Sequence, residues 1–123
     1  MALLGNTGIT QALNSLDATA AGTNVIAFVA LHTATPGTTG TSENAASGGY
    51  ARQACTWNAS SAGSAKTNST ALTFSTLGTV QVTHCAGWSA STAGTYGIGL
   101  ALGANITAAS ITVASAALSL TAT

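Results

Sequence analysis

The clearest pattern along the chain is a two-residue alternation of apolar and polar positions over residues 80–89. This period is typical of a β-strand, because successive side chains of a strand point to opposite faces. One face would carry Val80, Val82, His84, Ala86 and Trp88, and the other Gln81, Thr83, Cys85, Gly87 and Ser89. A second alternation over residues 95–102 sets bulky side chains between Gly and Ala, and a short turn-forming segment separates the two strands. We therefore predict a hairpin, with another layer or another subunit lying close to the small residues.

Shorter apolar segments indicate further strands. Residues 24–32 are rich in Val, Ile and Phe on both faces, which is typical of a strand buried on two sides. Further strands are predicted at residues 50–57, 71–75, 106–113 and 118–121. Segments rich in turn-forming residues separate them. The pattern predicts an all-β fold, an antiparallel β-sandwich or jelly-roll-like single domain.

The first residues follow a different period. Ile9, Leu13 and Leu16 recur at helical spacing, and Gly22 is a natural stop. The residues before this helix form a short apolar arm whose Leu3 and Leu4 would suit docking onto a neighbour. We predict two parts, an arm and helix over residues 1–22, and a β-sandwich domain over residues 23–123.

Composition leaves little bulk for a core. Ala, Gly, Ser and Thr occupy 76 of 123 positions, and two basic residues balance two acidic ones. A net charge near zero does nothing to keep copies apart. We interpret it as a feature of a protein that works packed against many copies or against a larger assembly, and the alternative is a stable neutral monomer. On the first interpretation the isolated monomer is only marginally stable.

The same composition excludes several classes of function. Non-specific nucleic-acid binding needs several cations, and only Arg52 and Lys66 are present. The longest strongly apolar run is far too short to span a membrane as a helix. The first residues carry no recognisable export signal, so we expect synthesis in the cytoplasm without export. Neither a nucleic-acid nor a membrane partner is expected.

Residues that could carry chemistry are few. Asp17 and Glu43 are the only carboxylate side chains, and nothing in the sequence brings them together. Cys55 and Cys85 are expected to be free, buried thiols, with a single cross-strand disulfide as the alternative. No nucleophile, metal or phosphate motif is present. We predict no enzymatic activity, no catalytic or metal site and no cofactor.

The most informative segment links the strand ending at His32 to the strand beginning near Tyr50 through a long loop. Our hypothesis is that Glu43 folds back onto Arg52 or His32 and pins this loop to the domain. Trp57, Trp88 and Tyr96 are candidate core or interface anchors. For the two tryptophans we favour a place inside the sandwich over an exposed position.

Several segments together resemble a known family. They are HTATPGTTGTSE, GGYARQ and TW between residues 32 and 57, and the later strand VTHCAGWSAS. This pattern is similar to that of small tailed-bacteriophage virion structural proteins, variously labelled capsid decoration, minor capsid or tail-fibre-like proteins. The resemblance covers roughly residues 26–121, and the chain departs from it in its helix-like leader and in an Ala- and Thr-rich last third.

The resemblance implies a non-enzymatic structural component of a phage particle. Among these labels, composition favours the capsid, as a decoration protein laid over the lattice of the major capsid protein in many copies. The resemblance further implies a homotrimer on the capsid surface, because such decoration proteins commonly form trimers. The alternative is a tail-tip or tail-fibre-associated protein that contacts the host. A more remote alternative is a carbohydrate-binding module, which would need an exposed aromatic platform from Tyr50, Trp57, Trp88 or Tyr96.

Overall fold

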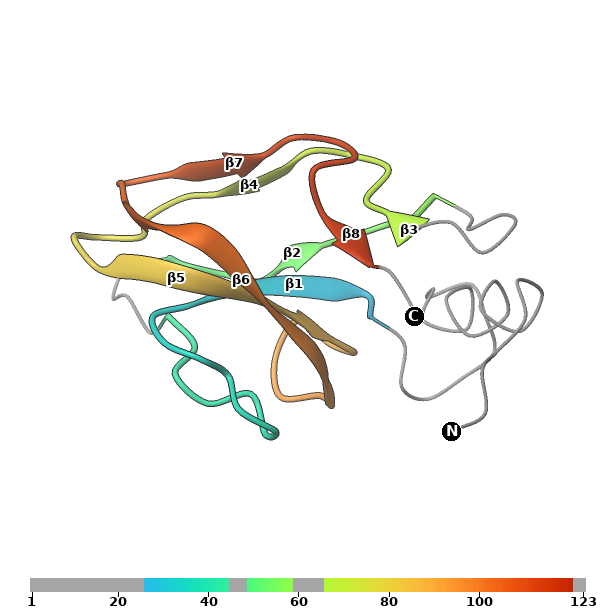
Figure 1. Ribbon diagram of the computed structural model, residues 1–123, viewed down its shortest axis with the longest axis horizontal. Helices are drawn as coiled ribbons and strands as arrows, with labels where there is room; N and C mark the ends of the chain where they lie inside the picture. Colours follow the sequence, from blue (N-terminus) through green and yellow to red (C-terminus); the bar gives the residue numbers. More distant parts are fainter. Residues whose placement is uncertain (1–25, 45–48, 59–65, 121–123) are drawn as a thin grey trace.

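The computed structural model describes residues 26–44, 49–58 and 66–120 (Figure 1). Within these ranges every regular element is a β-strand, and all strand pairs are antiparallel. The prediction of an all-β chain with antiparallel strands is therefore confirmed. The predicted arm and helix over residues 1–22, with Leu3 and Leu4, lie outside the described residues, so they stay predictions.

Eight strands follow one another along the described chain. They are β1 (Phe28–His32), β2 (Gln53–Ala54), β3 (Lys66–Thr67), β4 (Leu72–Phe74), β5 (Gln81–Trp88), β6 (Tyr96–Thr107), β7 (Ile111–Val113) and β8 (Ser119–Leu120). Strands β2, β1, β5 and β6 form one sheet in that order, and β4 pairs with β7 and β3 with β8. In Figure 1 the β4–β7 pair lies across the four-stranded sheet as a second layer. No helix in the described part is long and apolar enough to cross a membrane.

The main core joins these layers. Its buried members are Ile26, Val29, Leu31, Cys55, Trp57, Leu72, Phe74, Leu77, Val82, Cys85, Leu118 and Leu120. They come from the four-stranded sheet and from both strand pairs, so burial of apolar surface is what holds the layers together. Trp57 lies inside this core, and its indole Nε1–H donates a 2.8 Å hydrogen bond to the Ile26 carbonyl.

The predicted hairpin is present as β5 and β6, but the predicted faces of β5 are not. Val82 and Cys85 both belong to the main core, whereas Ala86 and Trp88 belong to a second cluster on the other face of the sheet. The change coincides with a shift of register, since Val82 faces Ile106 and His84 faces Ala101. A simple alternation cannot show such a shift, because it arises from the partner strand.

Two predicted strand boundaries also differ. The strand expected at 106–113 is divided, because its first two residues end β6 and β7 begins only at Ile111. Between them the chain turns, and the Ala109 carbonyl accepts a hydrogen bond from the Leu77 amide. The strand expected at 50–57 is reduced to the two residues of β2.

The small residues of the hairpin make room for parts of the same chain. A Cβ atom on Gly87 would lie 2.5 Å from the Ile26 side chain. A Cβ atom on Gly99 would lie 2.6 Å from the Tyr96 hydroxyl and 3.0 Å from Pro36. The close neighbour predicted beside these small residues is therefore, at both positions, another part of this chain.

Candidate functional site

Two loops meet over the face of the four-stranded sheet that lies opposite the main core. We call these two loops together the loop end. The first loop comprises residues 33–44, after β1, and the second comprises residues 89–95, between β5 and β6. Figure 1 shows both on the side of the sheet away from the β4–β7 pair. The segment that contributes Tyr50 and Arg52 runs beside them.

The first loop folds back on itself as a compact unit. Its ends are joined by hydrogen bonds from the Thr33 amide to the Ser42 carbonyl and from the Asn44 amide to the Leu31 carbonyl. Within it, the Pro36 carbonyl accepts from the Gly40 amide at 2.9 Å and from the Thr41 amide at 3.0 Å. This long connection is therefore an ordered structure with its own hydrogen bonds.

The first loop covers a small apolar cluster formed by Ala30, Ala86 and Trp88, with Phe28 and Tyr96 packed against it. The Tyr96 ring meets the Trp88 ring edge-on at 5.6 Å between centroids. The Tyr96 hydroxyl donates to the Gly37 carbonyl at 3.3 Å. Trp88, only 8% exposed, is thus covered by the chain's own loop.

The contact between Gly40 and Trp88 gives a test of this docking. At Gly40, φ is +76°, and an added Cβ would lie 2.5 Å from the indole ring, whereas at Gly37, φ is +61° and the nearest atom would be 4.0 Å away. Both Ala variants have the left-handed backbone cost of about 1–2 kcal/mol, but Gly40→Ala should lose about 1–3 kcal/mol more through overpacking. We expect faster cleavage after Glu43 by a glutamyl endopeptidase in Gly40→Ala than in Gly37→Ala. Equal rates would show that the loop is not held by this contact.

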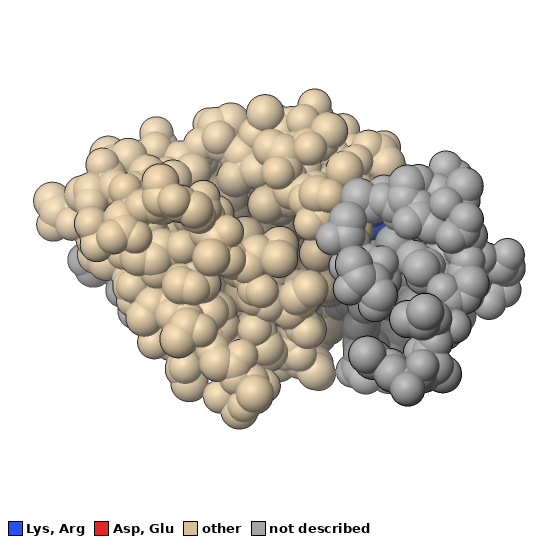
Figure 2. Space-filling view, viewed as in Figure 1, with Lys and Arg blue, Asp and Glu red and all other residues tan. Residues whose placement is uncertain are grey.

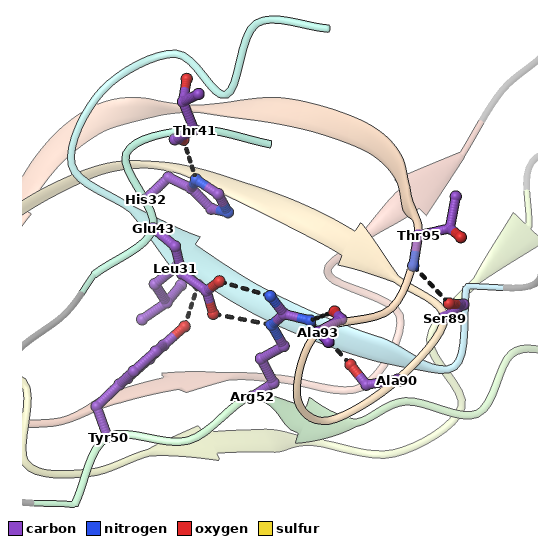
Figure 3. Close-up of polar contacts among 10 residues, drawn as sticks. All are labelled: Leu31, His32, Thr41, Glu43, Tyr50, Arg52, Ser89, Ala90, Ala93 and Thr95. Carbon is purple, nitrogen blue, oxygen red and sulfur yellow. Dashed lines mark hydrogen bonds and ion pairs between the residues drawn. The ribbon is translucent and has the colours of Figure 1, made fainter. Parts of the chain in front are cut away.

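Arg52 is the centre of the loop end (Figure 3). Its Nε donates to Glu43 Oε1 at 2.9 Å and its Nη2 to Glu43 Oε2 at 2.7 Å, a bidentate ion pair. Its Nη1 donates to the carbonyls of Ala90 and Ala93 at 3.0 and 2.7 Å. The guanidinium carbon lies 3.7 Å from the centroid of the Trp88 ring. One side chain therefore binds both loops and the tryptophan beneath them.

This arrangement uses properties that only arginine has. The planar guanidinium provides several fixed donors and can stack on an aromatic face while remaining charged. The side chain of Arg52 is only 8% exposed and that of Glu43 is 26% exposed. The charges of Arg52 and Glu43 balance, and two carbonyls take up further donors of the guanidinium, so the pair can be held with little water around it.

The second loop is shaped to present those carbonyls. Ala93 and Gly94 both have positive φ, +52° and +76°. The Ser89 amide donates to the Thr95 carbonyl at 3.0 Å, and the Thr95 amide donates to the Ser89 hydroxyl at 2.8 Å. The strain of a non-glycine residue at positive φ is offset where the Ala93 carbonyl meets Arg52.

His32 links the first loop to the apolar cluster around Trp88. Its Nδ1–H donates to the Thr41 carbonyl at 2.8 Å, and its ring is stacked near Trp88 at 6.4 Å between centroids. Among the described residues its buried Nε2 has no hydrogen-bond partner. Desolvation therefore lowers the pKa of His32 below 6.5, although the Thr41 carbonyl and the Glu43 charge oppose the shift.

His32 should make stability depend on pH. Because its pKa is lower in the folded state, the unfolded chain binds more protons around pH 6.5, so stability falls as pH falls through this region. The slope from this one group is at most about 1.4 kcal/mol per pH unit. Urea unfolding between pH 7.5 and 5 should show a smaller loss for His32→Gln than for the unchanged protein. Identical profiles would mean that His32 is not held neutral by the fold.

Tyr50 supports the same structure, which the sequence did not indicate. Its hydroxyl accepts a 2.7 Å hydrogen bond from the Leu31 amide, and its ring is stacked near Phe74. Burial raises the pKa of Tyr50 to about 12. An open cleft of about 290 Å³ lies beside it, between Glu43, Arg52 and Thr92.

The candidate residues from the sequence thus fall into two groups. His32, Glu43, Arg52, Trp88 and Tyr96 come together in the loop end. Trp57 lies apart, in the main core on the other face of the sheet. Both tryptophans are buried and Tyr50 and Tyr96 are half-buried, so the described aromatic side chains form no exposed platform for a sugar ring.

The described residues also contain no cluster suited to metal binding, because no three His, Cys, Asp or Glu side chains gather among them. Cys55 and Cys85 are buried free thiols, as predicted. Burial raises the pKa of Cys85 to about 11, which keeps the thiol protonated and unreactive. The hydrogen bonds, the ion pair and the aromatic contacts of this site hold the two loops in place.

A comparison with protein families identifies the class of the molecule. Residues 4–121 match the family described as podophage GP4 fiber I protein gp80. The chain belongs to this fiber I protein family. It is therefore a structural, non-enzymatic protein of a phage fibre. A search of curated proteins found no match to the chain.

Membership of the fiber I family confirms the resemblance to phage virion structural proteins. It corrects the location that we expected within the virion. Our main expectation was a capsid decoration protein on the capsid surface, with the tail-fibre protein as the alternative. The family supports the alternative, since its members are named for a fibre. A small neutral domain without fibrous repeats does not distinguish capsid from fibre, because a fibre can also be built from compact domains.

Proposed function

We propose that this fiber I family protein is a compact module of the tail fibre and that its loop end contacts the host surface. The observation that carries the proposal is the set of contacts around Arg52. A buried cation joins two surface loops through four hydrogen bonds and an aromatic contact. Loops held on a rigid scaffold are the usual place for recognition in β domains.

The exposed surface of the loop end suggests what it would bind. The outward residues are uncharged and rich in hydroxyl groups: Thr35, Thr38, Thr39, Thr41, Ser42, Ser91, Thr92 and Thr95. Such a surface favours a neutral polar partner that exchanges hydrogen bonds. Because Arg52 fixes the loops in advance, little conformational entropy remains to be lost on contact.

We further propose that neighbouring copies of the chain complete the domain as an open β-sandwich. The second layer consists of two separate strand pairs, and several aliphatic side chains next to the core are only partly buried. A second copy could cover these side chains, which supports the proposed self-association. A homotrimer is one form that such self-association could take. The major capsid protein was expected as a partner only together with a place on the capsid, so we do not propose it for a fibre protein.

Adsorption of phage to host cells tests the host contact. Thr38→Gln with Thr39→Gln enlarges two exposed residues of the first loop without changing charge. Thr73→Gln with Thr112→Gln makes the same change on the exposed positions of β4 and β7 and is the matched control. We expect the first pair to slow adsorption and the control to leave it unchanged, with both proteins equally stable. Unchanged adsorption for the loop variant would count against the proposal.

A further inference from the structure

Strand β6 forms a long open edge of the four-stranded sheet. It comprises twelve residues, and in the described part of the chain it pairs only with β5. The strand at the opposite edge, β2, has two residues, and the strands of the smaller pairs have two or three. Backbone N–H and C=O groups on the outer side of such an edge are available to another strand.

Nothing in the sequence of β6 protects this edge. The segment YGIGLALGANIT contains no charged residue and no proline, the features that usually block pairing. The register is irregular near Gly103, where φ is +75°, but residues 98–101 pair regularly with β5. This regular stretch is the part best suited to accept a partner strand.

A groove with a mostly apolar lining lies beside the same edge. It has a volume of about 280 Å³ and is lined by Leu100, Ala101 and Leu102 from β6, together with Cys85, Ala117, Leu118 and Ser119. Leu100 and Leu102 pack against the main core but are only partly buried. The edge therefore leaves aliphatic surface in water next to unpaired backbone, and a partner strand could cover both.

Charge does not oppose the approach of another copy. Arg52 and Glu43 neutralise each other, and Lys66 is 1% exposed with its ammonium donating to the Asn58 carbonyl. Figure 2 shows the described surface on this side as almost entirely uncharged. Like-charge repulsion, which keeps many proteins monomeric, is therefore absent from the described part.

We infer that the open edge of β6 and the groove beside it bind a second copy of this chain through strand addition. The partner is a copy because the described part of each chain has one long unpaired edge of this kind, and a single contact between two edges satisfies both. The alternating Ile, Leu and small residues of a second β6 would place bulky side chains over the groove and small ones where the sheets approach. A charged partner would bring charges against an edge that offers none in return.

Sedimentation measurements on the full chain, from about 1 to 100 μM, test the inference. We expect self-association, weakened about tenfold or more by Ala101→Lys, which places a charge on the exposed edge. Thr112→Lys, on the exposed face of β7, is the matched control and should leave association unchanged. Concentration-dependent protection of the β6 amides from hydrogen exchange should accompany association and be lost in Ala101→Lys.

Three results would overturn the inference. They are a monomer over the whole concentration range, association that Ala101→Lys does not weaken, and association that instead depends on Leu3 and Leu4, shown by a Leu3→Ser, Leu4→Ser variant. The inference rests on the proposed self-association, so a monomer would remove both, whereas association that Ala101→Lys does not weaken would remove only the strand addition. The host contact can fail separately, because its test depends on residues of the first loop and uses β4 and β7 only as the control.

Discussion

Replacing Trp88 with alanine should lower the free energy of unfolding by about 3–5 kcal/mol, the usual cost of removing a buried aromatic side chain. The effect is large because the indole supports several partners at once. Arg52 lies over it at 3.7 Å, and Tyr96 meets its edge. Gly40 of the first loop lies against the same ring. Denaturant unfolding measures the loss, and glutamyl endopeptidase cleavage after Glu43 measures release of the loop.

Trp57→Ala is the matched control for this prediction. Trp57 is as well buried as Trp88, at 7% against 8% exposed, so its removal should destabilise the protein by a similar amount. It lies in the main core, away from the loop end. At equal overall stability, set by denaturant, Trp88→Ala should therefore release the first loop more than Trp57→Ala. Equal release would mean that Trp88 contributes only general stability.

Arg52→Ala should be the second most damaging change, at about 3 kcal/mol. Removing one partner of a buried ion pair costs about 3–5 kcal/mol, and the lower end applies because Glu43 keeps some contact with water. The Ala90 and Ala93 carbonyls would also lose their donor. We expect both loops to become sensitive to proteolysis, whereas the main core should keep its slow hydrogen exchange.

Two further variants separate charge from geometry at this position. Arg52→Lys keeps the charge but loses the bidentate geometry, so it should recover less than about half of the lost stability. Glu43→Gln, combined with Arg52→Ala in a double-mutant cycle, should reveal a coupling of about 1–3 kcal/mol. A coupling near zero would show that the pair contributes nothing beyond its separate contacts.

The sequence predicts which residues of the loop end interact, but it does not predict the geometry of their contacts. With only four charged residues in the chain, Glu43 had few possible counter-ions, and Arg52 follows it closely. Nothing in the local pattern indicates that Arg52 also meets the Ala90 and Ala93 carbonyls. Those contacts depend on the positive φ of Ala93 and on the path of the second loop, which are set by tertiary packing.

The strands show the same division. The hairpin could be predicted because β5 and β6 alternate, and alternation reflects the two faces of a strand. The places of Val82 and Trp88 on opposite faces could not, because the chain changes register between Val82 and His84. A register shift depends on both strands of a pair, so one strand's own pattern does not contain it.

The proposed host contact would give these features a common purpose. A recognition surface that is rigid in advance loses little conformational entropy on contact. Arg52, Trp88 and Gly40 hold the loop end against a sheet that is itself packed on the main core. The scarcity of charge and bulk fits a domain whose open edge is covered by a neighbour.

The most direct test is a cryo-electron microscopy reconstruction of the phage bound to host envelope fragments. Our account predicts density for this domain within the tail fibre, with the first and second loops directed toward the envelope. Density for the domain on the capsid shell, or a loop end buried against the body of the fibre, would contradict it.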